Sequence, residues 1–356
     1  MSRGRLLIII GLCAVALAQQ QPPQPQPQQQ PQPQQQQPEA PEPPPIKVQV
    51  NEVIVPVTVT DYKNRFITNL SESDFRIFEN GREQKIKYFS AEHNQPVVVG
   101  FVLDLSSSSR IHWNRFQESA RELVWTLLSD DKADKYSGFL VTYSTDAELA
   151  VNTTNDAGKI TDRILKLKPG GGAALYDAIH LAITKHHMIK GEPIEPRRVL
   201  IVIGSGNDNA SKQTLDQIIE LAQRNLVTIY GVSTTAYGFA NEGDINLRRL
   251  AEETGGRVEY PLEGVYKDVS GHLSKPQSDY EGSYAITVES GGYAAAVSQN
   301  ILHAIANVAG EVTTQYILRY IPDTTDVQNP YRQIRVEVKI PDAKVRARRG
   351  YYPFAP

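Results

Sequence analysis

The sequence predicts an α/β protein with a doubly wound, mostly parallel sheet that is inserted into or flanked by a small β-rich domain. Two observations support this prediction. Between residues 96 and 310, short apolar runs alternate with segments of helical period, which is typical of a parallel sheet covered by helices on both faces. In 46–92 and 312–356, apolar residues recur at every second position, the period of a half-buried strand.

The composition is that of a folded soluble protein. Hydrophobic residues make up 40% of the 356-residue chain and charged residues 22%. The formal net charge is only -3, so no basic surplus is available to attract nucleic acid. We therefore expect no nucleic-acid partner.

The N-terminus has the pattern of a signal peptide. Two arginines precede the apolar run Leu6–Ala18, which is short for a membrane span and ends in the small-x-small motif Ala-Leu-Ala. We expect residues 1–18 to be removed after Ala18, with an uncleaved anchor helix as the alternative. The only cysteine, Cys13, would be lost with them, so the mature chain would contain no disulfide. The prediction is export to the periplasm, the cell surface or the medium, without membrane insertion after cleavage.

Residues 19–45 consist almost entirely of Gln and Pro. Such a segment cannot bury apolar surface, and its prolines favour extended conformations. We interpret it as a disordered linker that separates the folded part from a membrane or wall.

The first β-rich part, 46–92, contains two strand patterns. Valines at positions 53, 55, 57 and 59 alternate with other residues. Pro56 within this run indicates an edge strand. The runs 75–78 and 86–89 flank an Asn-Gly pair, which predicts a hairpin.

The α/β part, 96–310, follows with strands and helices in turn. Its predicted strands are 97–103, 136–143, 199–203 and 227–232. Its predicted helices are 116–128, 160–167, 175–188, 215–226, 245–254 and 297–308. Weakly patterned residues 261–295 are interpreted as an insertion. The C-terminal part, 312–356, returns to strand patterns at 316–321 and 334–340, and we expect it to pair with 46–92 in one domain. Two separate β pieces are the alternative.

Oxygen-bearing side chains follow two of the predicted parallel strands. Asp104-x-Ser106-x-Ser108 comes directly after the first, and Gly204-Ser205-Gly206 follows a later one. Ligand sites in such sheets lie outside the carboxyl ends of the strands. One carboxylate and two hydroxyls on a tight loop are hard oxygen ligands that suit Mg²⁺ or Mn²⁺.

The chain resembles von Willebrand factor A domains and, more narrowly, the VWFA-related domain proteins described from Acidobacteria. The resemblance extends from about Asn51 to Tyr352. The segments that carry it are VTVTDYKNRFITNLSESDFRIFENGREQKIKYFS (57–90), VVVGFVLDLSSSS (97–109), LYDAI (175–179), TTQYILRYIP (313–322) and VRARRGYYP (345–353). It implies a metal-ion-dependent adhesion site at the top of the domain, at which an acidic residue of the partner completes the coordination of the ion.

The resemblance also implies which residues would hold the ion. In the family pattern the first loop provides Asp, Ser and Ser, the second provides Thr, and the third provides Asp. Asp104, Ser106 and Ser108 match the first loop, whereas Ala173 occupies the Thr position and Ser205 the Asp position. Loss of one carboxylate beside a divalent ion costs on the order of a few kcal/mol at an intermediate dielectric. We therefore expect a degenerate site that binds Mg²⁺ or Mn²⁺ weakly or not at all.

Four neighbouring residues could replace the missing groups or contact a partner directly. Asp208 could compensate for the lost carboxylate, and Asp177 could reach the loop or cap its own helix. Arg110 and Asn207 could bind a partner without an ion.

These features predict an exported, non-enzymatic protein-binding or adhesion module with an unidentified protein ligand. The chain has no G-x-S-x-G or H-E-x-x-H motif, and no cysteine outside the N-terminal apolar run, so we do not expect an enzyme. The alternative is a structural component of the cell envelope that assembles through its β-rich domain, with the Asp104 loop purely structural. Its C-terminal tyrosines would then line either the assembly surface or the β-domain core.

Overall fold

The computed structural model describes residues 52–91, 96–184, 197–235, 241–262, 291–322 and 331–352. All of them belong to one compact unit, Gln49–Pro356. The predicted signal peptide (1–18), the Pro/Gln-rich linker (19–45) and most of the predicted insertion (261–295) lie outside the described residues.

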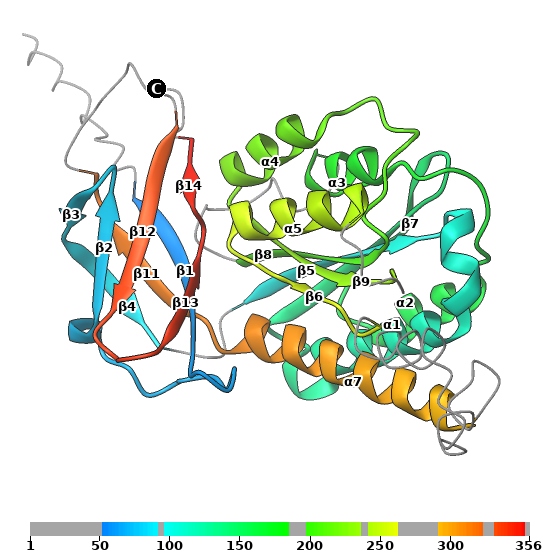
Figure 1. The fold of residues 1–356 in the computed structure, drawn as a ribbon, viewed down its shortest axis with the longest axis horizontal. Coiled ribbons are helices and arrows are strands. Elements are labelled where there is room, and N and C mark those ends of the chain that lie inside the picture. The colour runs from blue at the N-terminus through cyan, green and yellow to red at the C-terminus, as the bar shows by residue number, and fades with distance from the viewer. Residues whose placement is uncertain are drawn as a thin grey trace, which may run out of the picture. The chain divides into compact units, whose positions relative to one another are not determined.

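A six-stranded sheet forms the centre of the α/β part, in the order β10-β9-β8-β5-β6-β7 (Figure 1). The strands are β5 (Val97–Asp104), β6 (Tyr136–Tyr143), β7 (Ala147–Thr154), β8 (Arg197–Gly204), β9 (Val227–Ser233) and β10 (Val258–Glu259). All neighbouring pairs are parallel except β6 with β7, which is antiparallel. The predicted mostly parallel sheet is therefore confirmed. The edge strand β7 was not predicted, because its residues are half-buried or exposed without a clear alternation.

Helices cover both faces of this sheet. They are α1 (Trp113–Leu127), α2 (Ala157–Leu165), α3 (Leu175–Thr184), α4 (Leu215–Arg224), α5 (Glu242–Thr254) and α7 (Gly291–Thr313), with short 3₁₀ helices at Glu72–Asp74, Ser107–His112 and Asp130–Lys132. Side chains of α1, α2 and α7 share one core, and those of α3, α4 and α5 share the other. Figure 1 shows the two groups on opposite sides of the sheet.

The sequence of the central strand β5 is continuously apolar because both of its faces are buried. Val99 and Phe101 point into the core beneath α1, α2 and α7, whereas Val98 and Val102 point into the other core. Every residue of the strand is buried. Because the side chains of a strand alternate between two buried faces, each position must be apolar until the strand ends at Asp104.

Two antiparallel four-stranded sheets make up the β-rich part, in the orders β13-β1-β11-β4 and β14-β12-β2-β3. The strands are β1 (Val53–Thr60), β2 (Phe75–Glu79), β3 (Arg82–Gln84), β4 (Ile86–Ser90), β11 (Tyr316–Tyr320), β12 (Arg332–Val338), β13 (Lys344–Ala347) and β14 (Gly350–Tyr351). β1 pairs with β11 and β13, and β2 pairs with β12. Strands that precede the α/β part therefore pair with strands that follow it. Tyr316, Tyr320 and Tyr351 are buried in their core.

Two details of the β-rich part differ from the sequence prediction. β1 is not an edge strand, because it lies between β11 and β13. Pro56 is tolerated because β13 pairs with β1 only from Val57 onward, so the missing N–H faces no strand on that side. The hairpin at Asn80 and Gly81 joins β2 to β3, and β4 pairs with β11 in the other sheet instead.

No helix within the described residues is long and apolar enough to cross a bilayer.

Candidate functional site

Three loops meet beyond the carboxyl ends of β5 and β8. The first follows Asp104, the second is the glycine-rich segment 170–174 before α3, and the third follows Gly204. The N–H of Gly170 donates to the carbonyl of Leu105 at 2.6 Å, and the N–H of Ser107 donates to the carbonyl of Gly171 at 3.1 Å. Backbone hydrogen bonds therefore hold the first and second loops side by side.

Asp104 is the only carboxylate among the three first-loop residues that match the family pattern, Asp104, Ser106 and Ser108. It is buried, with 2% of its surface exposed. Its Oδ1 accepts a hydrogen bond from the N–H of Ser106 at 2.7 Å. Its Oδ2 accepts two more, from the N–H and the hydroxyl of Ser205, each at 3.2 Å. The carboxylate therefore holds its own loop through Ser106 and links it to the third loop through two hydrogen bonds from Ser205.

The two aligned serines of the first loop contact each other. The hydroxyls of Ser106 and Ser108 lie 2.7 Å apart, with Ser106 buried and Ser108 exposed. The hydroxyl of the exposed Ser107 accepts a hydrogen bond from the N–H of Gly171 at 3.2 Å. The first-loop residues Asp104, Ser106 and Ser108 are thus close together, with their side chains hydrogen-bonded within the protein.

Ser205 occupies the position at which the family pattern has a carboxylate. Besides donating to Asp104, its hydroxyl accepts hydrogen bonds from the backbone N–H of Asn207 at 3.4 Å and from its Nδ2 at 3.2 Å. Ser205 is 5% exposed. Asn207 therefore supports the third loop from within, in addition to any role at the surface.

Ala173 occupies the position at which the family pattern has Thr. Its methyl group is buried in the core shared with α3 and α4. Its N–H donates to Oδ1 of Asn209 at 2.8 Å, and the N–H of Asn209 donates back to the carbonyl of Ala173 at 2.9 Å. These bonds join the second loop to the third and leave no side-chain oxygen at this position.

The two remaining carboxylates are bonded to backbone groups near helix starts. Oδ2 of Asp208 accepts from the N–H of Tyr176 at 2.9 Å and from the hydroxyl of Ser211 at 2.5 Å. Asp177, in the first turn of α3, accepts from the N–H groups of Lys212 and Gln213 at 3.1 Å. Both carboxylates therefore fix the loop that leads into α4.

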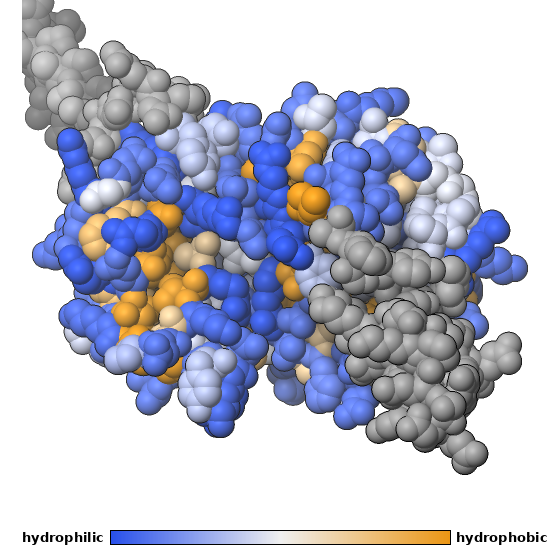
Figure 2. Space-filling model, in the orientation of Figure 1, coloured by the Kyte–Doolittle hydropathy of each residue, from blue (hydrophilic) through white to orange (hydrophobic). Residues whose placement is uncertain are grey.

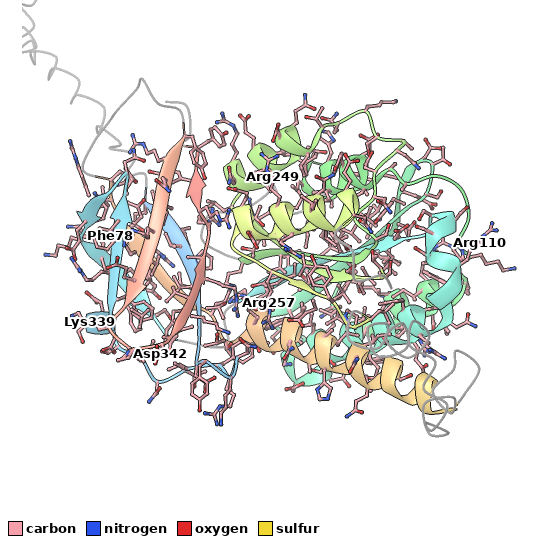
Figure 3. All side chains as sticks on the ribbon, viewed as in Figure 1. Phe78, Arg110, Arg249, Arg257, Lys339 and Asp342 are labelled. Atoms are coloured by element: carbon pink, nitrogen blue, oxygen red, sulfur yellow. The ribbon has the colours of Figure 1, made fainter. Side chains whose placement is uncertain are left out.

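Arg110 lies at the outer surface of the first loop, where its side chain points away from the domain (Figure 3). Its Nε donates a long hydrogen bond of 3.4 Å to the carbonyl of Pro169. A guanidinium attached by one weak bond keeps most of its donors for another molecule.

Tyr143, at the end of β6, completes the buried surroundings of Asp104. Burial, followed by the negative charges of Asp104 and Asp208, raises the pKa of the Tyr143 hydroxyl well above its ordinary value. Gly204 leaves room for this arrangement, since a Cβ there would collide with the hydroxyl and lie 2.8 Å from Cβ of Asp104. The hydroxyl therefore stays neutral beside the carboxylate.

The sequence did not single out Tyr143, Asn209 or Ser211, nor Thr145, whose hydroxyl accepts from the N–H of Gly172 at 3.0 Å. Asn209 and Ser211 lie within a few residues of the third loop, so the short polar run after Ser205 was a usable signal. Tyr143 and Thr145 lie near the end of a different strand, and only the order of the sheet brings them to the site.

The residues present fit a tightly bound divalent ion poorly. Both oxygens of the Asp104 carboxylate accept N–H or O–H donors, and positions 173 and 205 provide no second carboxylate. An Mg²⁺ site relies on one or two carboxylates and on oxygen atoms that point toward the ion. Within the described ranges, no group of three or more His, Cys, Asp or Glu side chains could hold a metal ion.

Residues 99–263 match the family model of the von Willebrand factor type A domain. This part of the chain is a von Willebrand factor type A domain. The predicted resemblance and fold class are therefore confirmed, whereas the narrower resemblance to VWFA-related proteins stays a prediction. Domains of this family are generally non-enzymatic interaction modules, and they commonly bind a divalent metal.

Solved structures that are similar to this chain include three proteins, with the following sequence identities and coverage. BatB from Bacteroides thetaiotaomicron is 17% identical, with a TM-score of 0.37 over 50% of this chain and 97% of its own. Proximal thread matrix protein 1 from the mussel byssus, with a zinc-occupied MIDAS motif, is 18% identical, with a TM-score of 0.38 over 48% and 42%. The vWF domain of the type V pili tip protein Mfa5 from Porphyromonas gingivalis is 17% identical, with a TM-score of 0.30 over 51% and 51%. No curated protein matches the chain.

Proposed function

We propose that this protein is an exported, non-enzymatic binding protein that holds a protein partner on the three loops of its von Willebrand factor type A domain, without a metal ion. The hydrogen bonding of Asp104 is the main support. One buried carboxylate joins the first and third loops through Ser106 and Ser205, the role that an ion would otherwise fill. The loops are thereby organised before a partner arrives, which lowers the entropic cost of binding.

The exposed residues of the same loops would contact the partner. Ser107, Ser108 and Arg110 are exposed, whereas the residues that support them are buried. Rigid support beneath polar, exposed tips is the arrangement expected of a protein-binding surface. Export is the sequence-based part of the proposal, and it depends on the signal-peptide pattern that ends at Ala18.

The experiment should separate the surface from its support. The purified protein is used to capture partners from envelope extract, and bound proteins are identified by mass spectrometry with and without EDTA. Arg110→Glu and Ser108→Arg change exposed residues of the first loop, and neither replaces a donor to the Asp104 carboxylate. Arg163→Glu, on the exposed side of α2, is the matched control.

We expect one partner to bind the wild type and the control equally, to be lost with both loop variants, and to remain in EDTA. A partner retained by both loop variants would place the binding surface elsewhere. Loss of the partner in EDTA would contradict metal-free binding.

A further inference from the structure

A groove lies between the von Willebrand factor type A domain and the β-rich strands. It has a volume of about 420 Å³, within the range of small-molecule sites. One side is formed by α5 and the residues around β10, and the other by β12, β13 and the residues that follow β13. It shares no residue with the three loops described above.

Arginines are concentrated in this groove, and Figure 3 labels Arg257 among them. The lining arginines are Arg248, Arg257, Arg335, Arg346, Arg348 and Arg349. Four of them pair with glutamates. Arg257 and Arg346 share the fully buried Glu311 at 2.8 and 2.9 Å, Arg349 contacts Glu252 at 2.5 Å, and Arg335 contacts Glu337.

The other two arginines have no carboxylate partner among the described residues. Arg248 is exposed and donates to the hydroxyl of Tyr260 at 3.4 Å, with its guanidinium 5.4 Å from the centre of that ring. Arg348 is 2% exposed, and its Nε has no hydrogen-bond partner in the described part of the chain. The titratable groups beside it are the phenols of Tyr320 and Tyr331, which are neutral because burial raises their pKa values.

An unpaired buried guanidinium is unfavourable because it has lost its water and gained no counter-charge. The same loss of water lowers the pKa of the buried Arg348 to about 10. An anion in the groove would supply the missing counter-charge. Guanidinium groups bind carboxylate and phosphate oxygens through paired N–H donors, so these two groups are the natural ligands.

The β-side of the groove carries apolar side chains between its arginines. Ile334, Val336, Val345 and Ala347 line it, and Val258 faces them from β10. Figure 2 shows the apolar surface of the β-rich part next to a band of hydrophilic side chains. A ligand that fills the groove would therefore combine an apolar body with an anionic group.

We propose that this groove binds a small amphipathic anion, an apolar molecule that carries one carboxylate or phosphate group, with Arg248 and Arg348 as its counter-charges. The site is independent of the protein-binding loops, since no residue is shared. The apolar body would lie against the apolar residues of β12 and β13, and the anionic group would lie between Arg248 of α5 and Arg348, which follows β13.

Isothermal titration calorimetry on the purified protein tests this site with defined probes. Octanoate and octyl phosphate carry both features, 1-octanol lacks the charge, and acetate and inorganic phosphate lack the apolar body. The variants are Arg348→Met and Arg248→Gln. Arg163→Gln is the control, because Arg163 lies on α2 in an exposed ion pair with Glu148.

We expect at least one of the two amphipathic anions to bind, at least about tenfold more tightly than 1-octanol, acetate or inorganic phosphate. Arg348→Met and Arg248→Gln should each weaken that binding by about tenfold or more, and Arg163→Gln should leave it unchanged. Comparison of the affinities of octanoate and octyl phosphate then shows whether the groove prefers a carboxylate or a phosphate. Should Arg348→Met fail to fold, the exposed Arg248→Gln carries the test.

Three results would overturn the proposal. The first is an absence of binding by both amphipathic anions. The second is binding of 1-octanol or inorganic phosphate that equals binding of the amphipathic anions, because the groove would then select only one of the two features. The third is unchanged binding in Arg248→Gln.

Discussion

Placing a carboxylate at position 205 should make the protein depend on a divalent ion. The Ser205 hydroxyl is 3.2 Å from Oδ2 of Asp104, and both residues are buried. In Ser205→Asp the two carboxylates would lie within about 4 Å, where like charges repel by about 4 kcal/mol at an effective dielectric constant of 20. Loss of the hydroxyl donor adds about 1 kcal/mol. Without metal, we therefore expect the free energy of unfolding to fall by about 5 kcal/mol at neutral pH.

An ion should reverse this loss. A divalent cation between the two carboxylates replaces repulsion by attraction, and a ligand at a hundred times its Kd stabilises the native state by about 2.7 kcal/mol. The pH dependence has a defined sign. Repulsion raises the folded-state pKa of the pair above the unfolded value, so the folded state binds the extra proton. The part of the deficit that comes from charge repulsion should be full at neutral pH and vanish as the pH falls below the unfolded value of about 3.9.

Urea unfolding followed by circular dichroism measures these effects in EDTA and in Mg²⁺. Ser205→Asn is the matched control, because it changes the side chain similarly without adding charge. Ala173→Thr combined with Ser205→Asp restores both family positions and should gain most from Mg²⁺. The reasoning fails if Ser205→Asp is as stable as Ser205→Asn in EDTA, or if wild type gains as much from Mg²⁺ as the charged variant.

Three further changes test other parts of the structure by the same urea assay. Asp104→Ala leaves three donors without an acceptor and should cost about 3 kcal/mol, whereas a cost below about 1 kcal/mol would deny it the linking role. Glu311→Ala leaves Arg257 and Arg346 without their shared buried carboxylate and should cost about 3–5 kcal/mol, and an unchanged urea midpoint would contradict this. Gly81→Ala forces a side chain into φ +80° and should cost about 1 kcal/mol, and an unchanged urea midpoint would show that the turn does not need glycine.

The four inner strands of the central sheet, β5, β6, β8 and β9, were predictable because their residues obey local rules. Val97 to Leu103 are apolar without interruption, and the first polar residue, Asp104, marks the strand end to within one position. A strand buried on both faces has no other acceptable pattern. The position of the candidate site followed directly, because the ends of neighbouring parallel strands meet at one edge of the sheet.

Features that depend on a distant partner were not predictable in the same way. Pro56 indicated an edge strand, which was wrong, because the sequence could not show that β13 pairs with the second half of β1. The Asn-Gly turn was found, yet the partner of 86–89 was not, because β4 pairs with a strand more than two hundred residues away. The ion pairs of Glu311 are likewise set by the fold, since Arg257 and Arg346 lie on opposite sides of it in the chain.

The two departures from the family pattern make physical sense together. A site with carboxylates at both 104 and 205 would carry two buried charges a few ångströms apart, and it would need an ion to be stable. With Ser at 205, the single carboxylate of Asp104 is balanced by three protein donors. If the protein binds its partner without an ion, as we propose, a side-chain oxygen at 173 has no ligand to hold, and the methyl group of Ala173 can pack into the core instead. Under this proposal, loss of the second carboxylate and loss of the threonine would be coupled consequences of exchanging an ion for hydrogen bonds.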